Sequence, residues 1–172
     1  NLPYLSVAIG SLRMRTPVML ASGTVGYGAE YEGLIDFGAV GAIVLKTVTV
    51  QPREGNRPPR LCETEGGLLN AIGLENVGIE RFLEEELPRA SRLPAPLVAS
   101  VGGGDVEEFA ELARAAGERE EIAAVELNIS CPNVERRRLP LWADPDRVNE
   151  VVVEARTETS KPLLVKLSPK AG

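Results

Sequence analysis

The chain has 172 residues, of which 44% are hydrophobic and 26% are charged, values that are ordinary for a soluble globular protein. That length usually corresponds to one domain or to part of one. The formal net charge of -6 at pH 7 argues against nucleic acid as a main partner, and no apolar run approaches the ~18 residues that a membrane helix needs. We therefore expect a cytoplasmic protein that binds neither nucleic acid nor a membrane.

The two cysteines, Cys62 and Cys131, show neither a disulfide framework nor the spacing of a metal site, so we expect no metal. Histidine is absent, so a general base must be Cys, Lys, Asp, Glu or Tyr. The first residues, 1–4, carry no signal-peptide pattern, which also favours the cytoplasm.

The first part of the chain predicts a small hairpin and then a buried strand. Residues 5–9 and 12–14 are separated by a Gly-Ser pair, which is typical of a hairpin. Residues 17–21 are a buried strand candidate that stops at Ser22, and a cluster of glycines follows. That cluster is either a flexible loop or a backbone that closely approaches a flat or phosphorylated ligand.

A short helix is predicted over residues 31–37, and the next strand candidate, 42–45, ends at Lys46 and Thr47. A lysine at the end of a buried strand has two interpretations. Its ammonium either reaches solvent along the flexible stem or faces a ligand.

Residues 50–78 are long for a connection between a strand and a helix. They form either a lid or binding loop, or a plain surface insertion. Within them, residues 70–74 combine one amide with apolar groups and a glycine, which favours packing on a small ligand. An amphipathic helix with a solvated, glutamate-rich face is predicted over residues 79–91.

A further strand, 96–99, ends at Ser100, and a helix capped by Asp105 is predicted to run to Ala116. The chain then alternates again between strands and helices. The strand 122–127 leads into a stretch that combines amides with a cysteine.

The stretch Asn128–Asn133 contains two amides, a hydroxyl and a thiol at the end of a strand. Two Asn side chains can bind both faces of a cyclic amide, and Cys is a base or nucleophile once its thiolate is favoured. The alternative is an Asn-rich turn with a small buried cysteine. A helix over 144–157 and a strand over 162–165 that ends at Lys166 complete the pattern.

Five strand candidates thus end in polar residues, with helices between most of them: Ser22, Lys46, Ser100, Asn128 and Lys166. A (β/α)₈ barrel builds its active site from that end of its strands, whereas an open doubly wound sheet uses fewer strands. Five contributing strands favour the barrel. Because a whole barrel needs roughly 250 residues, we interpret residues 1–172 as the N-terminal part of a single TIM-barrel domain.

The chain resembles the N-terminal part of the class 1 dihydroorotate dehydrogenases, cytosolic flavin enzymes of pyrimidine biosynthesis. One matching motif would be weak evidence, but six in the family's order are specific. The matching stretches are Pro17–Gly23, Gly41–Thr47, Pro52–Arg60, Gly67–Leu74, Glu126–Asn133 and Val165–Pro169.

This resemblance implies FMN-dependent oxidation of dihydroorotate to orotate, with catalytic roles for Cys131 and Lys46. Cys131 would remove a proton from carbon 5, and a hydride would pass from carbon 6 to flavin N5. The positions that match the FMN site are Ser22, Lys46, Thr47, Asn128 and Lys166. The positions that match the substrate site are Lys46, Asn70, Ala71, Ile72, Gly73, Leu74, Asn128 and Asn133.

The chain departs from the family pattern in three places. Relatives usually have Asn where this chain has Ser100, whose hydroxyl can still hydrogen-bond flavin but reaches less far. Residues 135–142 stand where the family has a glycine-rich active-site loop. The second half of the barrel, with the loops that hold the FMN phosphate, is missing, so we expect residues 1–172 alone to be inactive.

Two sequence features, the loop Pro52–Asn56 and the stretch Gly73–Asn76, most resemble the NAD-linked branch of class 1. That branch pairs this subunit with a second one that carries FAD and a 2Fe-2S cluster, and we also expect a homodimer. Two alternatives stay open. One is a flavin domain like that of dihydropyrimidine dehydrogenase, which usually has His where this chain has Asn133; the other is a non-catalytic, truncated barrel that acts as a scaffold.

Overall fold

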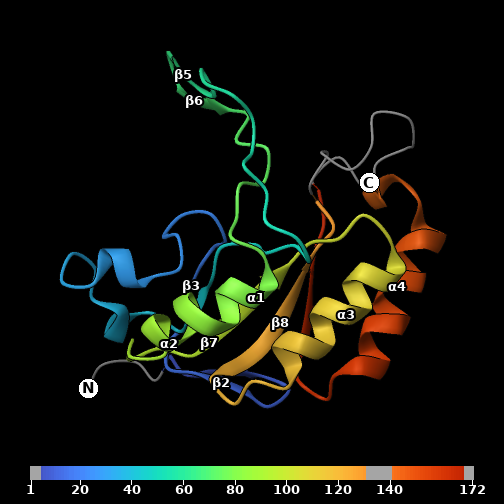
Figure 1. Cartoon of the computed structure of the whole chain (residues 1–172). Helices are drawn as coiled ribbons and strands as arrows, with labels where there is room; N and C mark the ends of the chain where they lie inside the picture. Colours follow the sequence, from blue (N-terminus) through green and yellow to red (C-terminus); the bar gives the residue numbers. More distant parts are fainter. Residues whose placement is uncertain (1–4, 131–140, 169–172) are drawn as a thin grey trace.

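The computed structural model describes residues 5–130 and 141–168. Its centre is a curled sheet of five parallel strands, consistent with part of a (β/α)₈ barrel (Figure 1). In spatial order the strands are β3 (Met19–Leu20), β4 (Ala42–Val44), β7 (Leu97–Val101), β8 (Ile122–Asn128) and β9 (Leu163–Lys166). Sequence order and spatial order agree, as expected when right-handed crossovers connect neighbouring strands.

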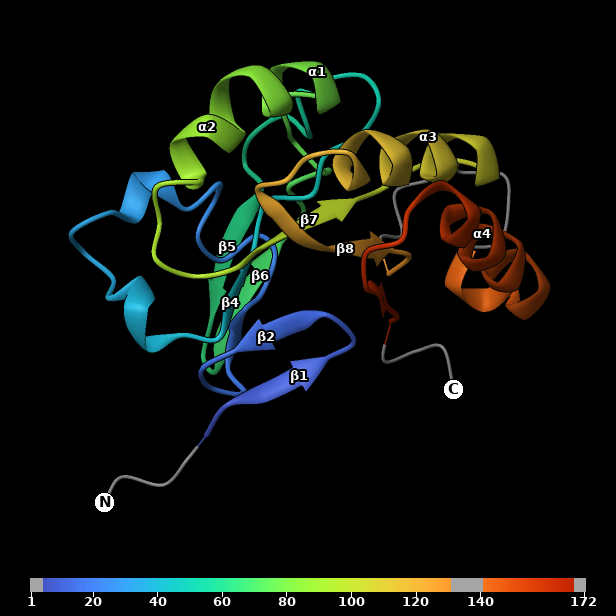
Figure 2. The same ribbon diagram turned by 90° about the horizontal axis from the view of Figure 1, so that it is seen from below.

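Helices cover the outer face of this sheet (Figure 2). The first is nearly continuous, with a π-helical turn η3 in its middle, and the others are α3 and α4. Asp105 and Asp144 cap α3 and α4 by accepting a hydrogen bond from the backbone N–H three residues later. The bounds are α1 (Ile79–Arg81), η3 (Phe82–Glu86), α2 (Leu87–Ala90), α3 (Val106–Gly117), η4 (Leu141–Ala143) and α4 (Pro145–Glu158).

Alternation along each strand separates two layers of core. Outward-facing residues such as Ile43 and Leu97 pack with helix residues such as Phe82 and Phe109. The inward-facing residues at the amino ends of the strands are apolar too, and they pack against the antiparallel pair β1 (Val7–Ile9) and β2 (Leu12–Met14). That inner cluster consists of Leu12, Met14, Ala42, Val44, Val98 and Ala124.

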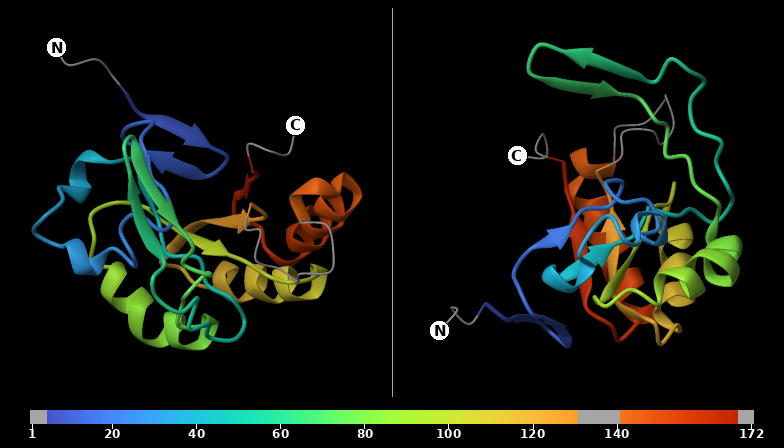
Figure 3. Two further views of the ribbon diagram at one scale, coloured as in Figure 1. Left: turned by 90° about the horizontal axis from the view of Figure 1, so that it is seen from above. Right: turned by 90° about the vertical axis from the view of Figure 1, so that its left-hand side faces the viewer.

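The long connection after β4 contains a second antiparallel pair, β5 (Leu61–Thr64) and β6 (Gly67–Asn70), which projects away from the sheet (Figure 3). All eight of its residues are exposed. The protruding hairpin therefore contributes little to the core of the described residues.

Asn76 fixes the base of this connection. Its Oδ1 accepts hydrogen bonds from the backbone N–H groups of Thr49 at 3.1 Å and Gly78 at 2.9 Å, and its Nδ2 donates to Leu74 O at 2.8 Å. Asn76 is only 7% exposed, so these hydrogen bonds are shielded from water. The base of the connection is thus buried and hydrogen-bonded, whereas its tip is exposed.

The helix predicted over residues 31–37 is wrong. The structure has only two short 3₁₀ turns in this region, η1 (Ala29–Tyr31) and η2 (Phe37–Ala39). Gly33, between them, has a φ of 83°, which a right-handed helix does not allow. Leu34 is 80% exposed, so the segment also lacks the buried face that stabilises a short helix.

Within residues 5–130 and 141–168, no helix combines the length and the apolar character needed to cross a membrane.

Candidate active site

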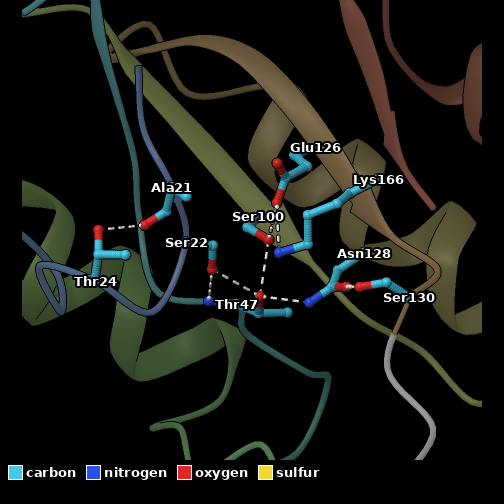
Figure 4. Close-up of polar contacts among 9 residues, drawn as sticks. All are labelled: Ala21, Ser22, Thr24, Thr47, Ser100, Glu126, Asn128, Ser130 and Lys166. Carbon is cyan, nitrogen blue, oxygen red and sulfur yellow. Dashed lines mark hydrogen bonds and ion pairs between the residues drawn. The ribbon is translucent and has the colours of Figure 1, made fainter. Parts of the chain in front are cut away.

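Polar side chains from four strands meet at the carboxyl end of the sheet (Figure 4). Ser22 follows β3, Thr47 follows β4, Ser100 lies in β7 and Asn128 ends β8. The Thr47 hydroxyl is their common partner: it lies 2.9 Å from Ser22 Oγ, 2.8 Å from Ser100 Oγ and 2.9 Å from Asn128 Nδ2. The structure thus brings together four residues that the sequence predicted for the FMN site.

The hydroxyl hydrogens in this cluster have one consistent arrangement. Ser100 Oγ lies 2.8 Å from Glu126 Oε1, and an ionised carboxylate can only accept, so Ser100 donates to Glu126. Thr47 must then donate to Ser100, and Ser22 must donate to Thr47. The hydroxyl chain runs from Ser22 to Glu126, with every hydrogen directed toward the carboxylate.

Glu126 is the site residue that sequence reasoning missed. It is 8% exposed and projects from the inner face of β8, two residues before Asn128. The Lys166 ammonium lies 3.7 Å from Glu126 Oε1, so the fifth predicted strand-end residue joins the cluster through this carboxylate. A single acidic residue in an otherwise apolar strand, on the same face as Asn128, was the available signal.

The side-chain amide of Asn128 is held in one orientation. Its Nδ2 donates to Thr47 Oγ1, and its Oδ1 accepts from Ser130 Oγ at 2.7 Å. Because both ends of the amide are bound, its donor faces the hydroxyl chain and its acceptor faces the following turn.

Lys46 directly precedes Thr47, just after the end of β4. Among the residues that the structure describes, its ammonium has neither an ion pair nor a hydrogen bond. It borders a cleft of about 740 Å³ whose lining includes Gly23, Tyr27, Arg53, Glu75 and Asn76. Burial raises the pKa of the Tyr27 phenol, whose oxygen accepts a hydrogen bond from Val77 N.

The predicted substrate stretch, residues 70–74, is only partly drawn into the site. Asn56 holds its middle, because Asn56 Nδ2 donates to Ala71 O and Asn56 N donates to Ile72 O. Leu74 lines a small pocket of about 100 Å³ together with Asn128. Asn70 is exposed at the end of β6.

The backbone of this stretch requires glycine at one position. Gly73 has a φ of 78°, and a Cβ there would lie 2.7 Å from Asn56 N. Leu74 follows with a φ of 57°, a conformation that is uncommon for a branched side chain. Backbone strain of this kind is concentrated at ligand sites, and here it orients Leu74 toward the small pocket.

The predicted base, Cys131, and the predicted substrate residue Asn133 lie outside the described residues. Their predicted roles stay predictions. Asn128 and Ser130, which immediately precede them, lie at the carboxyl end of the sheet.

The described residues define an α/β protein with parallel strands and a candidate ligand site at the strands' carboxyl ends, where buried hydroxyl, amide and carboxylate groups gather. A family model described as dihydroorotate dehydrogenase matches residues 4–171. The chain belongs to this family, which confirms the resemblance that the sequence motifs indicated.

Curated relatives agree with this assignment. The chain is 46% identical over 167 residues to a protein of Geotalea uraniireducens and 47% identical over 167 residues to one of Trichlorobacter lovleyi. Both relatives are named dihydroorotate dehydrogenase B (NAD(+)), catalytic subunit. Each match covers 97% of this chain and 55% of the relative, so the chain spans about half the length of the curated relatives it matches.

Proposed function

We propose that this chain is part of an enzyme that oxidises dihydroorotate to orotate with FMN, in the biosynthesis of pyrimidines. The observation that carries the proposal is the hydrogen-bonded cluster at the carboxyl ends of the strands, in a chain of this family. In the complete protein, further strands would close the sheet into a (β/α)₈ barrel with this cluster at its mouth.

The residues present fit a flat cofactor that carries carbonyl and ring-nitrogen groups. The candidate holding residues are hydroxyls, one amide and two ammonium groups: Ser22, Lys46, Thr47, Ser100, Asn128 and Lys166. Gly23, beside them, has open space where a side chain would stand, which suits close approach of a ligand to the backbone. Bound FMN would supply the hydride acceptor that no side chain of the protein can provide.

Cys131 is our candidate for the base that takes the proton from carbon 5 of dihydroorotate. A free cysteine has a pKa of about 8.5, so a neighbouring positive charge would favour its thiolate near neutral pH. Lys46, unpaired among the described residues, can supply such a charge to the substrate or to the base. The substrate would contact residues 70–74, Asn128 and Asn133.

The relatives named catalytic subunits support a partner subunit for this protein. We propose that the partner carries FAD and a 2Fe-2S cluster and passes electrons to NAD, that the chain also forms a homodimer, and that the complex is cytoplasmic. The full-length protein purified with that partner should reduce NAD with dihydroorotate, whereas efficient reduction of fumarate without it would contradict the NAD-linked assignment.

The two cysteines allow a matched test of the base. In the full-length enzyme, Cys131→Ala should abolish formation of orotate at neutral pH and leave bound FMN unchanged, while Cys62→Ala should leave both unchanged, since Cys62 is exposed on β5. Cys131→Ser should retain some activity, shifted to higher pH. Wild-type turnover in Cys131→Ala would contradict this role, and preference for dihydrouracil would favour the dihydropyrimidine dehydrogenase alternative.

A further inference from the structure

Glu126 holds the only carboxylate in the hydrogen-bonded cluster of the described residues. Its side chain is 11% exposed, and it contacts two groups from different strands, Ser100 Oγ at 2.8 Å and Lys166 Nζ at 3.7 Å. Lys166 is opposite Asn128 in the strand register, yet its ammonium forms its ion pair with Glu126, one inner-face layer deeper in the sheet. The hydroxyl chain and the Lys166 ammonium therefore both end at a group that binds no ligand in the proposed function.

A buried carboxylate is costly unless it is paired and hydrogen-bonded, and an apolar side chain would fill the same space at lower cost. Stability is thus a weak reason for Glu126. Its two contacts have a clearer consequence, because one fixes a charge and the other fixes the direction of a hydrogen-bond chain.

The direction of the chain determines what it can offer a ligand. With Glu126 ionised, the hydroxyl hydrogens of Ser22, Thr47 and Ser100 are all used inside the cluster. Thr47 Oγ1 also accepts from Asn128, so its capacity is filled. Of the three hydroxyls, only one lone pair on each serine oxygen is left, because Ser22 Oγ also accepts a hydrogen bond from Thr47 N at 3.1 Å. The hydroxyls can therefore accept from a ligand but cannot donate to it, and Ser100 is only 1% exposed.

We propose that Glu126 is a positioning residue for the flavin site, a role that rests on the proposed function. It anchors the Lys166 ammonium and partly offsets its positive charge. It also keeps the hydroxyl chain pointing inward, so that the partly exposed Ser22 hydroxyl presents an acceptor and Lys166 presents positive charge. Glu126 thereby sets how strongly the site favours negative charge on a bound flavin.

Sulfite is a suitable probe, because it adds to N5 of oxidised flavins and places negative charge on the ring without any turnover. In the full-length, FMN-loaded enzyme, Glu126→Gln removes the charge that offsets Lys166, so sulfite should bind at least tenfold more tightly. Lys166→Met should weaken sulfite binding by a similar factor. In the double variant, Glu126→Gln should lose its effect, because its partner is already absent.

Glu126→Asp is the conservative variant, since it keeps the charge and shortens the side chain by one methylene. Its sulfite affinity should lie between those of the wild type and Glu126→Gln. A purely structural role would lower the melting temperature of these variants and leave their sulfite affinity unchanged. An affinity within twofold of the wild type in both Glu126 variants would overturn the proposal; if Glu126→Gln does not fold, the same result for Glu126→Asp alone would do so.

Wild-type oxidation of dihydroorotate, measured in parallel, separates the two proposals. If the wild type holds FMN but does not form orotate, the proposed function fails and the sulfite comparison still tests Glu126. If the wild type is active and the sulfite affinities do not respond to Glu126, only the role of Glu126 fails.

Discussion

The two ends of the central sheet's inner face use the same strands for different purposes. At the amino end, inward residues such as Val98 and Ala124 are apolar and are covered by Leu12 and Met14 of β2. At the carboxyl end, two residues further along β7 and β8, the inward residues are Ser100 and Glu126. Position along a strand therefore separates residues that stabilise the fold from residues that can contact a ligand.

Two lysines at the ends of β9 show the same contrast. Lys161, just before the strand, donates hydrogen bonds to the carbonyl oxygens of Arg119 and Ile122, and burial lowers its pKa. Lys166, at the end of the strand, pairs with Glu126 in the polar cluster. We expect Lys161 to affect stability alone and Lys166 to affect the flavin site.

The largest effect on stability is expected at the amino end. Leu12 is 1% exposed, so Leu12→Ala should lower the free energy of unfolding by about 2–5 kcal/mol, since it leaves a cavity in the inner cluster. Denaturant unfolding of the full-length protein measures this. Ile9→Ala is the control on the same hairpin, because Ile9 is 40% exposed and should change the value by less than about 0.5 kcal/mol.

Leu12→Ala should leave the affinity of the folded protein for FMN unchanged, because the inner cluster lies at the opposite end of the strands from the polar side chains. A loss of FMN affinity that exceeds the loss of folded protein would break the separation between the two ends.

Lys161→Met should have the next largest effect on the free energy of unfolding. The substitution leaves two backbone carbonyl oxygens without their donor, which costs about 1–3 kcal/mol of unfolding free energy. Bound FMN should not change. Lys166→Met is the matched comparison on the same strand and should lose part of its bound FMN, so equal flavin loss in the two variants would contradict the contrast.

The lowered pKa of Lys161 adds a dependence on pH. Just below the ordinary value of 10.5, the unfolded chain still holds the proton that the folded chain has already lost. Because the unfolded state then binds more protons, this group makes the free energy of unfolding rise with pH in that interval. The contribution of this group should be absent from Lys161→Met when both proteins are titrated side by side.

The polar end of each strand could be predicted because a buried strand is a run of apolar residues, and the first polar residue after it is easily recognised in the sequence. Apolar segments followed at once by Ser22, Lys46 or Asn128 fix both the strand and the side of the sheet to which its end belongs. The five strands accordingly form one parallel sheet. The family motifs then pointed to the same residues, so the two arguments reinforce each other.

The misses arise where tertiary contacts decide the outcome. Glu126 was passed over because the strand around it is apolar, and only its contacts with Ser100 and Lys166 reveal its role. The importance of Asn76 depends on its hydrogen bonds with Thr49, 27 residues earlier in the chain, which no local pattern encodes. The helix predicted over residues 31–37 failed because Gly33 adopts a left-handed backbone.

At the carboxyl end, Thr47→Val tests the hydroxyl cluster directly. Valine keeps the shape of threonine but removes the hydroxyl oxygen. Ser22, Ser100 and Asn128 then lose their common hydrogen-bond partner. We expect FMN to bind about tenfold more weakly in the full-length protein, equivalent to about 1.4 kcal/mol. Thr24→Val is the control, because the Thr24 hydroxyl donates only to the nearby Ala21 O.

Ser130→Ala should have the smallest effect, and it sharpens the comparison within the polar end itself. The Ser130 hydroxyl donates to Asn128 Oδ1, whereas Thr47 accepts from Asn128 Nδ2. The contact with Thr47 is buried and the one with Ser130 is only partly buried, so water can replace the serine but not the threonine. The amide would also keep its orientation, because Nδ2 is still bound.

We therefore expect Ser130→Ala to weaken FMN binding by no more than about threefold, or roughly 0.6 kcal/mol, with the melting temperature unchanged. Fluorescence titration of the FMN-free, full-length protein with FMN would measure the FMN affinity of Ser130→Ala and of Thr47→Val under the same conditions. If Ser130→Ala cost as much as Thr47→Val, the turn after β8 would be as important as the buried hydroxyl chain. Burial would then not be what ranks the contacts at this end of the sheet.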